Sequence, residues 1–398
     1  MIKTAQRIAE VEEYYFSKKL QEVRSLDTSD FPVINLGIGS PDLMPDEKTI
    51  AALSKTALQP TSHGYQNYKG VPSLRQAIAD FSKRIYGIEL NPNDEILPLM
   101  GSKEGIMHIS MAFVDEGDTV LIPDPGYPTY ASVSKLVGAN VETYKLSAAR
   151  GWQVDINDLE SRDLSGVKIM WLNSPHMPTG SVMDKTIMER IISLAQKNNF
   201  LVVNDNPYSL ILNNSPESLL SIDGANEVAL ELNSLSKSHN MAGWRVGWVA
   251  GKKELIDAVL KVKSNMDSGM FLGIQNAAVE ALNQPRQWFV DLNDTYKKRR
   301  KVAFEILDEL ECAYDEAQVG LFVWAKAPEH VKSVEKWIDE ILYGSKVFIT
   351  PGFIFGNAGK EFIRISLCAN EDNLRTAKER IGKLKIEGKS KQRMEATS

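Results

Sequence analysis

The sequence predicts an α/β protein: a largely parallel sheet covered by helices, joined to a smaller α+β domain. Between about residues 46 and 261, short apolar runs of strand length alternate with segments whose apolar residues recur at helical spacing. Strands that are apolar along their whole length are buried on both faces, as in a doubly wound sheet. After about residue 254 the pattern changes to long helical stretches and then to a strand–helix–strand–helix order. The chain of 398 residues also exceeds what one hydrophobic core usually serves, so we expect two domains.

The elements of the first part follow from these patterns. Ile8, Val11 and Leu20 recur among charges and predict an amphipathic helix over residues 2–23. A short strand is expected at 31–35, before a Gly-containing turn at 37–42. The strands of the large sheet are expected in the apolar runs 96–99, 119–122, 167–172, 200–203, 228–232 and 246–250, with helices between them.

The second part begins with helical stretches over 255–282 and 288–310. It continues with a strand at 320–325, a helix at 331–343, a strand at 362–367 and a helix at 370–384. We therefore expect a large α/β domain over 45–285 and a small α+β domain built from 1–44 and 286–384. The polar, Lys-rich tail 385–398 has nothing to bury and is predicted to be disordered.

Composition excludes several classes of function. The chain carries 46 Lys and Arg against 52 Asp and Glu, a net charge of −6, which argues against nucleic-acid or anionic-membrane binding. Two cysteines cannot form a disulfide framework, and neither a CxxC nor an HExxH pattern occurs, so we expect no metal site. The sequence shows no signal-peptide core and no apolar run of membrane-spanning length, so a cytoplasmic location is expected.

The segment Ser234-Leu235-Ser236-Lys237 lies between two expected core strands, and Arg245 follows it. Partial burial and the nearby cation would lower the pKa of Lys237 and favour a nucleophilic, imine-forming amine. Two serines and a planar guanidinium are suited to a phosphate group. A surface loop whose Lys and Arg merely flank the sheet is the alternative explanation.

Residues after three other strands suggest a ligand site at the carboxyl ends of the sheet. Asp205 could hold a protonated pyridine nitrogen, and Tyr208 could bond a phenolate oxygen, although for Asp205 taken alone a turn or N-cap role is the favoured explanation. The Gly-Ser-Lys turn at 101–103 opens a helix and could bind phosphate through backbone amides, but such turns are common. Tyr127, held between Gly126 and Pro128, could stack on an aromatic cofactor or simply pack under its turn.

Arg364 lies inside the apolar strand expected at 362–367 and needs an anionic partner there, either a structural carboxylate or that of a substrate. The order of these features along the chain is more informative than any one of them. A phosphate cradle, a stacking aromatic, a ring-nitrogen acid, an imine lysine and a phosphate arginine together describe pyridoxal 5′-phosphate.

On these residues the chain resembles the fold type I, pyridoxal-phosphate-dependent aminotransferases of class I/II. The Ser-x-Ser-Lys block with an arginine eight residues later carries the resemblance most specifically. It implies a large domain with a mostly parallel, seven-stranded sheet between helices. It also implies that Lys237 is the catalytic lysine and that the following residues hold the cofactor: Ser102, Lys103, Tyr127, Asp205, Tyr208, Ser234, Ser236 and Arg245.

The resemblance further implies a homodimer with shared active sites, in which Tyr65 reaches the phosphate of the neighbouring subunit. Gly39 and Arg364 resemble the positions that hold the substrate α-carboxylate. The expected substrates are an L-amino acid and a 2-oxo acid, of LL-diaminopimelate, aspartate or alanine type. Tyr14 resembles a substrate-contacting tyrosine of the first group.

One position departs from the family pattern, which usually reads Asn-Pro-Thr-Gly where this chain has Met177-Pro178-Thr179-Gly180. A methionine cannot donate a hydrogen bond to the ring oxygen, so Tyr208 is expected to hold that oxygen alone. Asn173, at the end of its strand, is expected to substitute in part at the substrate site.

Two other functions compete with transamination. The spacing of Ser234 and Lys237 also fits the Ser-x-x-Lys of serine acyl-transferring enzymes, but their Ser-Asp-Asn and Lys-Thr-Gly strings are absent. That motif also opens a helix, whereas a loop is expected here. A non-catalytic or lyase-type relative that binds the same cofactor is the other alternative, and Met177 is its support.

Overall fold

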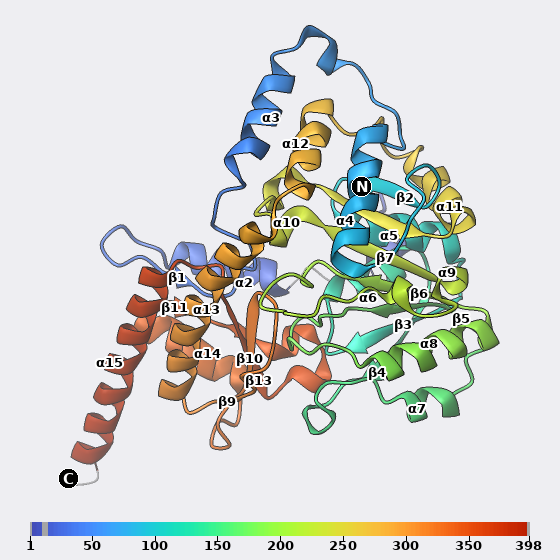
Figure 1. The fold of residues 1–398 in the computed structure, drawn as a ribbon. Helices are drawn as coiled ribbons and strands as arrows, with labels where there is room; N and C mark the ends of the chain where they lie inside the picture. The colour runs from blue at the N-terminus through green and yellow to red at the C-terminus, as the bar shows by residue number, and fades with distance from the viewer. Residues whose placement is uncertain (1, 10–14, 396–398) are drawn as a thin grey trace.

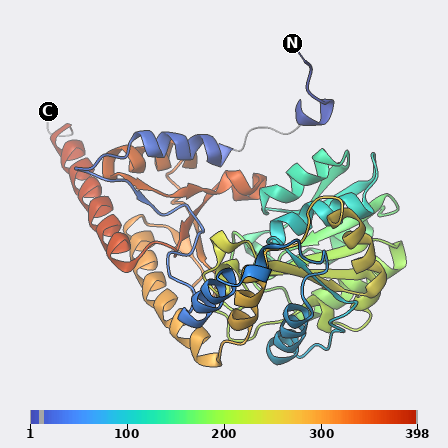
Figure 2. The same cartoon turned by 90° about the horizontal axis from the view of Figure 1, so that it is seen from above.

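The computed structural model describes residues 2–9 and 15–395. The chain forms a large α/β part and a smaller part that contains the N-terminal helix α2 and the C-terminal helix α15 (Figures 1 and 2). The site described below lies between these two parts, so their arrangement decides which residues can reach it.

The large part is built on a seven-stranded sheet with the order β2-β8-β7-β6-β5-β3-β4. β8 pairs antiparallel with both β2 and β7, and the remaining pairs are parallel. The expected mostly parallel sheet of seven strands is therefore confirmed. Its strands are β2 (Ile96–Leu99), β3 (Thr119–Asp124), β4 (Asn140–Lys145), β5 (Val167–Leu172), β6 (Leu201–Asp205), β7 (Ala229–Ser234) and β8 (Gly247–Gly251).

Helices cover both faces of this sheet because its strands present apolar side chains to both sides. Val120 and Ile122 pack with Ile109 of α5, whereas Leu121, between them, packs with Ile191 of α8 on the other face. The helices of the large part are α3 (Glu47–Ala57), α4 (Pro72–Tyr86), α5 (Ser102–Phe113), α6 (Pro128–Leu136), α7 (Ile156–Ser161), α8 (Lys185–Asn198), α9 (Ala225–Val228), α10 (Leu235–Ser238), α11 (Lys253–Lys263) and α12 (Leu272–Leu282).

Besides α2, the smaller part packs three helices against two small sheets. β9 (Ala313–Tyr314), β10 (Phe322–Lys326), β12 (Thr350–Pro351) and β13 (Phe362–Ser366) form an antiparallel sheet in the order β12-β13-β10-β9, and β1 (Ile34–Asn35) pairs parallel with β11 (Val347–Phe348). The helices are α13 (Arg286–Glu309), α14 (Val334–Ser345) and α15 (Glu371–Glu395). One core, with Ile306, Val323 and Ile365 at its centre, joins these elements.

The N-terminal segment differs from the single helix expected over 2–23. The described residues form α1 (Gln6–Ala9) and α2 (Tyr15–Ser25), and residues 10–14 lie outside the described part. α2 is fastened to α14 by polar contacts: Lys19 Nζ lies 2.6 Å from Asp339 Oδ1, and the Tyr15 hydroxyl donates to Glu335 Oε1 at 3.2 Å. α2 is therefore fixed along the small part, beside the site.

Three further expectations need correction. The helix expected over 255–282 is broken into α11 and α12, because Gly269 has φ +85° and packs against the backbone of Gln66. β4 was not expected, since its mostly exposed side chains lack an apolar run. The tail expected to be disordered from residue 385 continues as α15 to Glu395, in a segment rich in the good helix formers Lys, Glu and Arg.

Short 3₁₀ turns complete the described chain: η1 (Pro60–His63), η2 (Ala148–Arg150), η3 (Leu219–Ser221), η4 (Ala242–Trp244), η5 (Gly352–Phe355) and η6 (Asn357–Gly359). Of the helices in the described residues, none combines the length and the apolar composition needed to cross a bilayer.

Candidate active site

The expected site residues meet because of the direction of the strands. The parallel strands β2, β3, β5, β6 and β7 all end at one edge of the sheet, and the antiparallel β8 begins there. The segments that follow these five parallel strands, and the segment that precedes β8, are therefore neighbours in space.

A cavity of about 510 Å³ lies at this edge, between the large and the small part. Both parts contribute to its wall, and so does α2 through Phe16. Twelve of the fourteen site residues expected from the sequence line it: Gly39, Ser102, Lys103, Tyr127, Asn173, Asp205, Tyr208, Ser234, Ser236, Lys237, Arg245 and Arg364.

Lys237 is half-buried, and its amine Nζ donates a hydrogen bond of 2.6 Å to the carbonyl oxygen of Gly39. Burial lowers the pKa of its ammonium group, and the positive charges of Arg364 and Arg245 lower it further. The neutral, nucleophilic form of the amine is thus favoured in this cavity.

The local structure around Lys237 is not the loop that the sequence suggested. Ser234 caps the short helix α10 by accepting a hydrogen bond from the amide of Ser236 at 3.1 Å, and Lys237 lies within that helix. The argument from a loop against the Ser-x-x-Lys alternative was therefore wrong. The absence of the accompanying Ser-Asp-Asn and Lys-Thr-Gly strings still stands against it.

Asp205, at the end of β6, is buried with one carboxylate oxygen paired and the other without a hydrogen-bond partner. Oδ2 accepts a hydrogen bond of 2.9 Å from the hydroxyl of Tyr130, whereas Oδ1 has no hydrogen-bond partner in the described residues. Burial raises the pKa of the carboxyl group to about 6, against the opposing effects of Tyr130 and Lys237. A buried carboxylate oxygen without a hydrogen-bond partner lowers the stability of the fold. A ligand that carries a cationic or neutral N–H group could donate a hydrogen bond to it.

Tyr130 is a site residue that the sequence analysis missed. Its ring stacks on Trp171 at a centroid distance of 5.1 Å and meets Tyr127 edge-on at 5.6 Å. It therefore positions both the carboxylate of Asp205 and the ring of Tyr127. The available signal was its place three residues after Tyr127 at the start of a helix, which puts both side chains on one face.

The turn before α5 presents backbone amides to the cavity. Gly101 precedes the helix with φ +91°, and Ser102 and Lys103 provide its first two N–H groups, which have no partner within a helix. A Cβ at Gly247 would lie 2.8 Å from the amide nitrogen of Ser102, so a glycine there allows β8 to approach this turn closely.

Ser234, Ser236 and Arg245 gather beside that turn. The hydroxyls of the two serines lie 2.9 Å apart, and Nη1 of Arg245 lies 3.5 Å from the oxygen of Ser236. Arg245 is exposed at the mouth of the cavity, and its Nη2 would lie 2.1 Å from a Cβ added at Gly101. Hydroxyls, free amides and a guanidinium are thus concentrated at one end of the cavity, which we call the phosphate end.

The opposite end is formed around Arg364 of β13, which is 6% exposed. Its Nη2 donates to the carbonyl oxygen of Gly37 at 2.8 Å, and its guanidinium carbon lies 3.9 Å and 4.6 Å from the ring centres of Phe322 and Phe355. A Cβ at Gly39 would lie 2.4 Å from the Phe322 ring, so only glycine allows the 37–39 segment to pass here. We call this the arginine end.

Tyr127 and Tyr208 lie between the two ends and are half-buried. The ring of Tyr208 meets Phe322 edge-on at 5.9 Å. Burial raises the pKa of the Tyr208 hydroxyl above its ordinary value, so the group remains a protonated donor at neutral pH.

Met177 lines the cavity and contacts Arg364, with Sδ 3.2 Å from Nη1. Asn173 beside it uses both halves of its amide for the backbone: its nitrogen donates to the Asp205 carbonyl at 2.6 Å, and its oxygen accepts from the Met177 amide at 2.7 Å. The side chain of Asn173 therefore supports the segments that carry Asp205 and Met177.

Two expected residues are not part of this cavity. The side chain of Tyr65 is 93% exposed and does not line the site of its own chain. Tyr14 lies outside the described residues.

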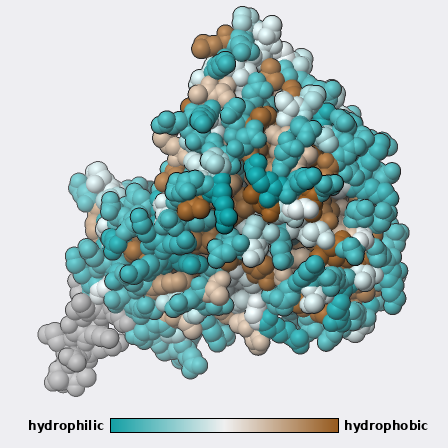
Figure 3. Space-filling model, viewed as in Figure 1, coloured by the Kyte–Doolittle hydropathy of each residue, from teal (hydrophilic) through white to brown (hydrophobic). Residues whose placement is uncertain are grey.

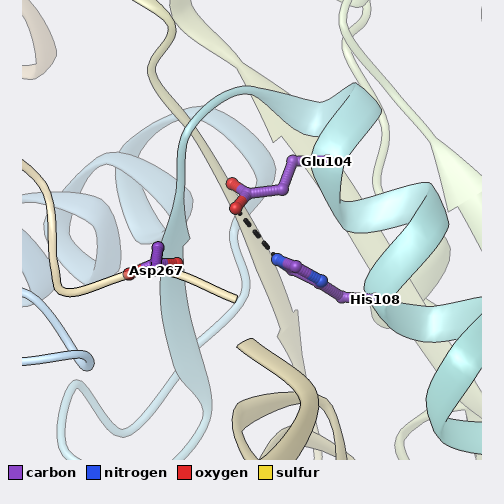
Figure 4. Close-up of side chains that lie close together, drawn as sticks. All are labelled: Glu104, His108 and Asp267. Carbon is purple, nitrogen blue, oxygen red and sulfur yellow. Dashed lines mark hydrogen bonds and ion pairs between the residues drawn. The ribbon is translucent and has the colours of Figure 1, made fainter. Parts of the chain in front are cut away.

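A group of ionisable side chains lies behind the phosphate end (Figure 4). Glu104 Oε2 accepts from the Met100 amide at 2.5 Å, Glu104 Oε1 pairs with Nε2 of His108 at 2.9 Å, and the nearby Asp267 binds the ammonium of Lys263 at 2.8 Å. Because Glu104 reaches back across the start of α5, it fixes the turn at 100–103. The sequence analysis gave no role to this group.

Comparisons with known proteins agree with this geometry. The family model "Aminotransferase class I and II" matches residues 32–381. The LL-diaminopimelate aminotransferase of Dehalococcoides mccartyi is 38% identical over 378 residues, which cover 94% of this chain and 96% of that protein. That of Natranaerobius thermophilus is 37% identical and covers 96% and 99%. The structure of BacF from Bacillus subtilis superposes with a TM-score of 0.91 at 33% identity, covering 96% of this chain and 98% of that one.

Proposed function

This chain belongs to the class I and II aminotransferases, and we propose that it moves the amino group of an L-amino acid to a 2-oxo acid in two half-reactions. Enzymes of this family use pyridoxal 5′-phosphate. The observation that carries the proposal is one cavity shared by three groups: an amine with a lowered pKa on Lys237, the unpaired oxygen of Asp205, and the phosphate end.

The residues present fit this cofactor. The free Oδ1 of Asp205 would accept a hydrogen bond from the protonated ring nitrogen, whose positive charge would also favour the carboxylate. The amides of residues 102–103, Ser234, Ser236 and Arg245 would hold the phosphate. Tyr127 would stack on the ring, and Tyr208 would donate to the ring oxygen, with Met177 unable to add a second donor.

When bound, pyridoxal phosphate supplies an aldehyde and an electron-withdrawing ring. Lys237 would provide the amine that this aldehyde requires and, when not joined to it, a base that takes the proton from the substrate Cα and delivers it to the carbon that carried the aldehyde. Arg364 binds the substrate α-carboxylate and thereby sets the orientation of Cα. Asp205 keeps the ring nitrogen protonated, which preserves the electron-withdrawing character of the ring.

We further propose that the working enzyme is a homodimer whose sites are shared. Tyr65 is 93% exposed, and Met44, Leu58 and Met266 are 73%, 85% and 58% exposed. Single exposed apolar residues are ordinary, but Met44 and Leu58 flank α3, Tyr65 follows η1 and Met266 precedes α12, and α3 packs against α12 in the upper part of Figure 1. Hydrophobic surface also gathers below these helices in the middle of the face in Figure 3. A second copy of the chain would cover this hydrophobic surface, and Tyr65 of one subunit would reach the phosphate end of the other.

A half-reaction tests the proposed activity. The protein loaded with pyridoxal phosphate is mixed with single L-amino acids in the absence of any 2-oxo acid, and the released 2-oxo acid is measured with the change in visible absorption. We expect about one oxo acid per site and no further turnover until an acceptor is added. A stable visible band that no amino acid changes would contradict amino transfer and favour a non-catalytic binder of the cofactor.

Mixed dimers test the shared site. Lys237→Ala and Tyr65→Ala subunits are inactive or weak alone, but a mixed dimer contains one site with both native residues. Activity that rises on mixing supports sharing, whereas activity that stays at the average of the two variants contradicts it. Light scattering on the native protein reports the mass of the assembly independently.

A further inference from the structure

The wall of the cavity near the arginine end is apolar, and this has a consequence for the substrate. The two faces of the Arg364 guanidinium are covered by Phe322 and Phe355, and the Met177 thioether touches its edge. An α-carboxylate that binds this guanidinium therefore enters between aromatic and thioether groups.

Three apolar lining residues near the arginine end could contact the side chain of a substrate. They are Phe16 of α2 together with Ile354 and Phe355 of η5. A second cavity of about 450 Å³ shares Phe16, Ile354, Phe355 and Tyr127 with the first, but its further lining includes the charged Asp124 and Lys135, so only the shared apolar wall bears on the substrate side chain. The substrate side chain can therefore extend along an apolar wall that comes from both α2 and the small part.

The charged groups of the lining give the complementary evidence. Among the described residues that line the first cavity, the cations are Lys103, Lys237, Arg245 and Arg364, and the only carboxylate is Asp205. Lys103 and Arg245 belong to the phosphate end, and Lys237 and Asp205 face the cofactor. At the arginine end this leaves Arg364, whose charge the α-carboxylate neutralises.

A second ionic group on the substrate, if it lay against this wall, would therefore be buried without an opposite charge among the described residues that line the first cavity. Burial of an unpaired charge is strongly unfavourable, whereas burial of an apolar side chain against Phe16, Ile354 and Phe355 is favourable. The side chains of dicarboxylic and diamino acids fit this wall poorly for the same reason.

We propose that the preferred amino donor is an L-amino acid with a large, uncharged, apolar side chain, aromatic or long aliphatic, which packs against Phe16, Ile354 and Phe355. This inference rests on the proposed amino transfer, since it assigns a substrate class to that same site. It also separates this chain from the activity that its diaminopimelate-specific relatives are named for.

The first arm of the test measures the donor half-reaction of the loaded native protein. L-Phenylalanine, L-leucine and L-methionine are compared with L-aspartate, L-glutamate and LL-2,6-diaminopimelate. We expect kcat/KM at least about tenfold higher for the apolar donors, the range of discrimination that an apolar pocket gives. A higher value for L-aspartate or diaminopimelate would overturn the inference.

The second arm measures binding without reaction, by calorimetry with 3-phenylpropanoate and succinate, which lack the amino group. We expect 3-phenylpropanoate to bind at least about tenfold more tightly in the native protein. Ile354→Arg, which adds a cation to the apolar wall, should shift the ratio of the two affinities toward succinate by a similar factor. Val290→Arg, which adds the same charge at a residue of α13 that is 41% exposed, should leave the ratio unchanged.

The two arms distinguish the possible failures. Two results would overturn the proposed substrate class. One is tighter binding of succinate than of 3-phenylpropanoate by the native protein, and the other is the same ratio of these two affinities in Ile354→Arg as in Val290→Arg. If no donor releases an oxo acid, the proposed function fails, and the binding ratio still decides whether the wall is an apolar pocket. Ile354→Leu keeps the wall apolar and should retain the native ratio, which separates the effect of charge from a packing defect.

Discussion

The two ends of the cavity are built in different ways. The phosphate end consists of groups that directly follow or precede strands of one sheet: the amides of 102–103, Ser234, Ser236 and Arg245. The arginine end combines side chains from distant parts of the chain, with Phe16, Met177, Phe322, Ile354 and Arg364 coming from five separate segments. The phosphate end would bind the phosphate of the cofactor, which is the same in every reaction, through backbone amides, hydroxyls and a guanidinium. The side chains of the arginine end can change without disturbing the large sheet.

The comparison suggests a division of tasks. Residues at the phosphate end should control whether the cofactor stays bound, and residues at the arginine end should control which carboxylates bind. Lys237 lies between the ends, where its amine contacts the Gly39 carbonyl and shares the cavity with Asp205. The following changes are ordered from the largest expected effect to the smallest.

Lys237→Ala should abolish the reaction while it leaves the groups of both ends in place. It removes the only lysine amine inside the described cavity apart from the exposed Lys103, and with it the proton transfer at Cα. We expect the half-reaction to slow by at least about 10⁴-fold. Rapid-mixing absorbance measures this rate, with Lys252→Ala as the control, because Lys252 pairs with Glu227 and does not line the cavity. A loss of less than about tenfold would contradict the assigned role.

Arg364→Gln and Arg245→Gln should separate the two ends. Removal of one partner of a buried, hydrogen-bonded charge pair costs about 2–5 kcal/mol, so Arg364→Gln should weaken substrate carboxylate binding by about 10²–10³-fold. Its affinity for pyridoxal phosphate should change little. Arg245→Gln should do the reverse, lowering cofactor affinity while substrate affinity at saturating cofactor is kept. Equal effects of both variants on both ligands would remove the distinction between the ends.

Asp205 should make the stability of the cofactor-free protein depend on pH. Its folded-state pKa is raised to about 6 by burial, so the protonated form is favoured in the folded state. The protonated Asp205 therefore contributes up to about 3 kcal/mol to the free energy of unfolding. This contribution is fully present below the unfolded-state pKa of about 4 and is lost as pH rises through about 6.

Asp205→Asn has no such titration. Urea unfolding of the cofactor-free native protein and of the variant at several pH values measures the difference between them. The native protein should lose stability relative to the variant as pH rises from about 4 to about 7. A difference that is constant over this range would show that Asp205 is not buried as described.

Gly101→Ala should have the smallest effect, and a matched control isolates its cause. Gly101 and Gly117 both have positive φ, +91° and +89°, so an alanine at either should cost about 1–2 kcal/mol of unfolding free energy. At Gly101, whose ψ of 153° adds to the strain, the new Cβ would also lie against Arg245, whereas a Cβ added at Gly117 would have nothing within 4 Å. Cofactor affinity should therefore fall only in Gly101→Ala, and an equal fall in both variants would contradict the contact.

The same contrast explains what the sequence could predict. The phosphate end was predictable because each of its residues adjoins an apolar run, and parallel strands bring their carboxyl ends to one edge. Strands β2 and β5 match the expected ranges for the same reason: apart from the exposed Lys168 of β5, their residues are apolar and buried. β4 was missed because its exposed, polar residues carry no such run.

Of the arginine end, the sequence indicated the charged residue Arg364 but not the residues that surround it. Arg364 was visible as a charge within an apolar strand, but nothing in the sequence indicates that Phe322 and Phe355 cover its faces. Phe16, Ile354 and Tyr130 were missed because their roles arise from packing between segments far apart in the chain. Asn173 was expected at the substrate, yet the structure shows that its amide holds the backbone of Asp205 and Met177.

Covalent trapping tests the central claim most directly. The protein is loaded with pyridoxal phosphate, reduced with borohydride and digested, and the peptides are mapped by mass spectrometry. The account predicts one modified site per chain, with the cofactor's aldehyde carbon joined to Nζ of Lys237, and no modification of the exposed Lys103. Modification spread over several lysines, or a single site elsewhere than Lys237, would contradict it.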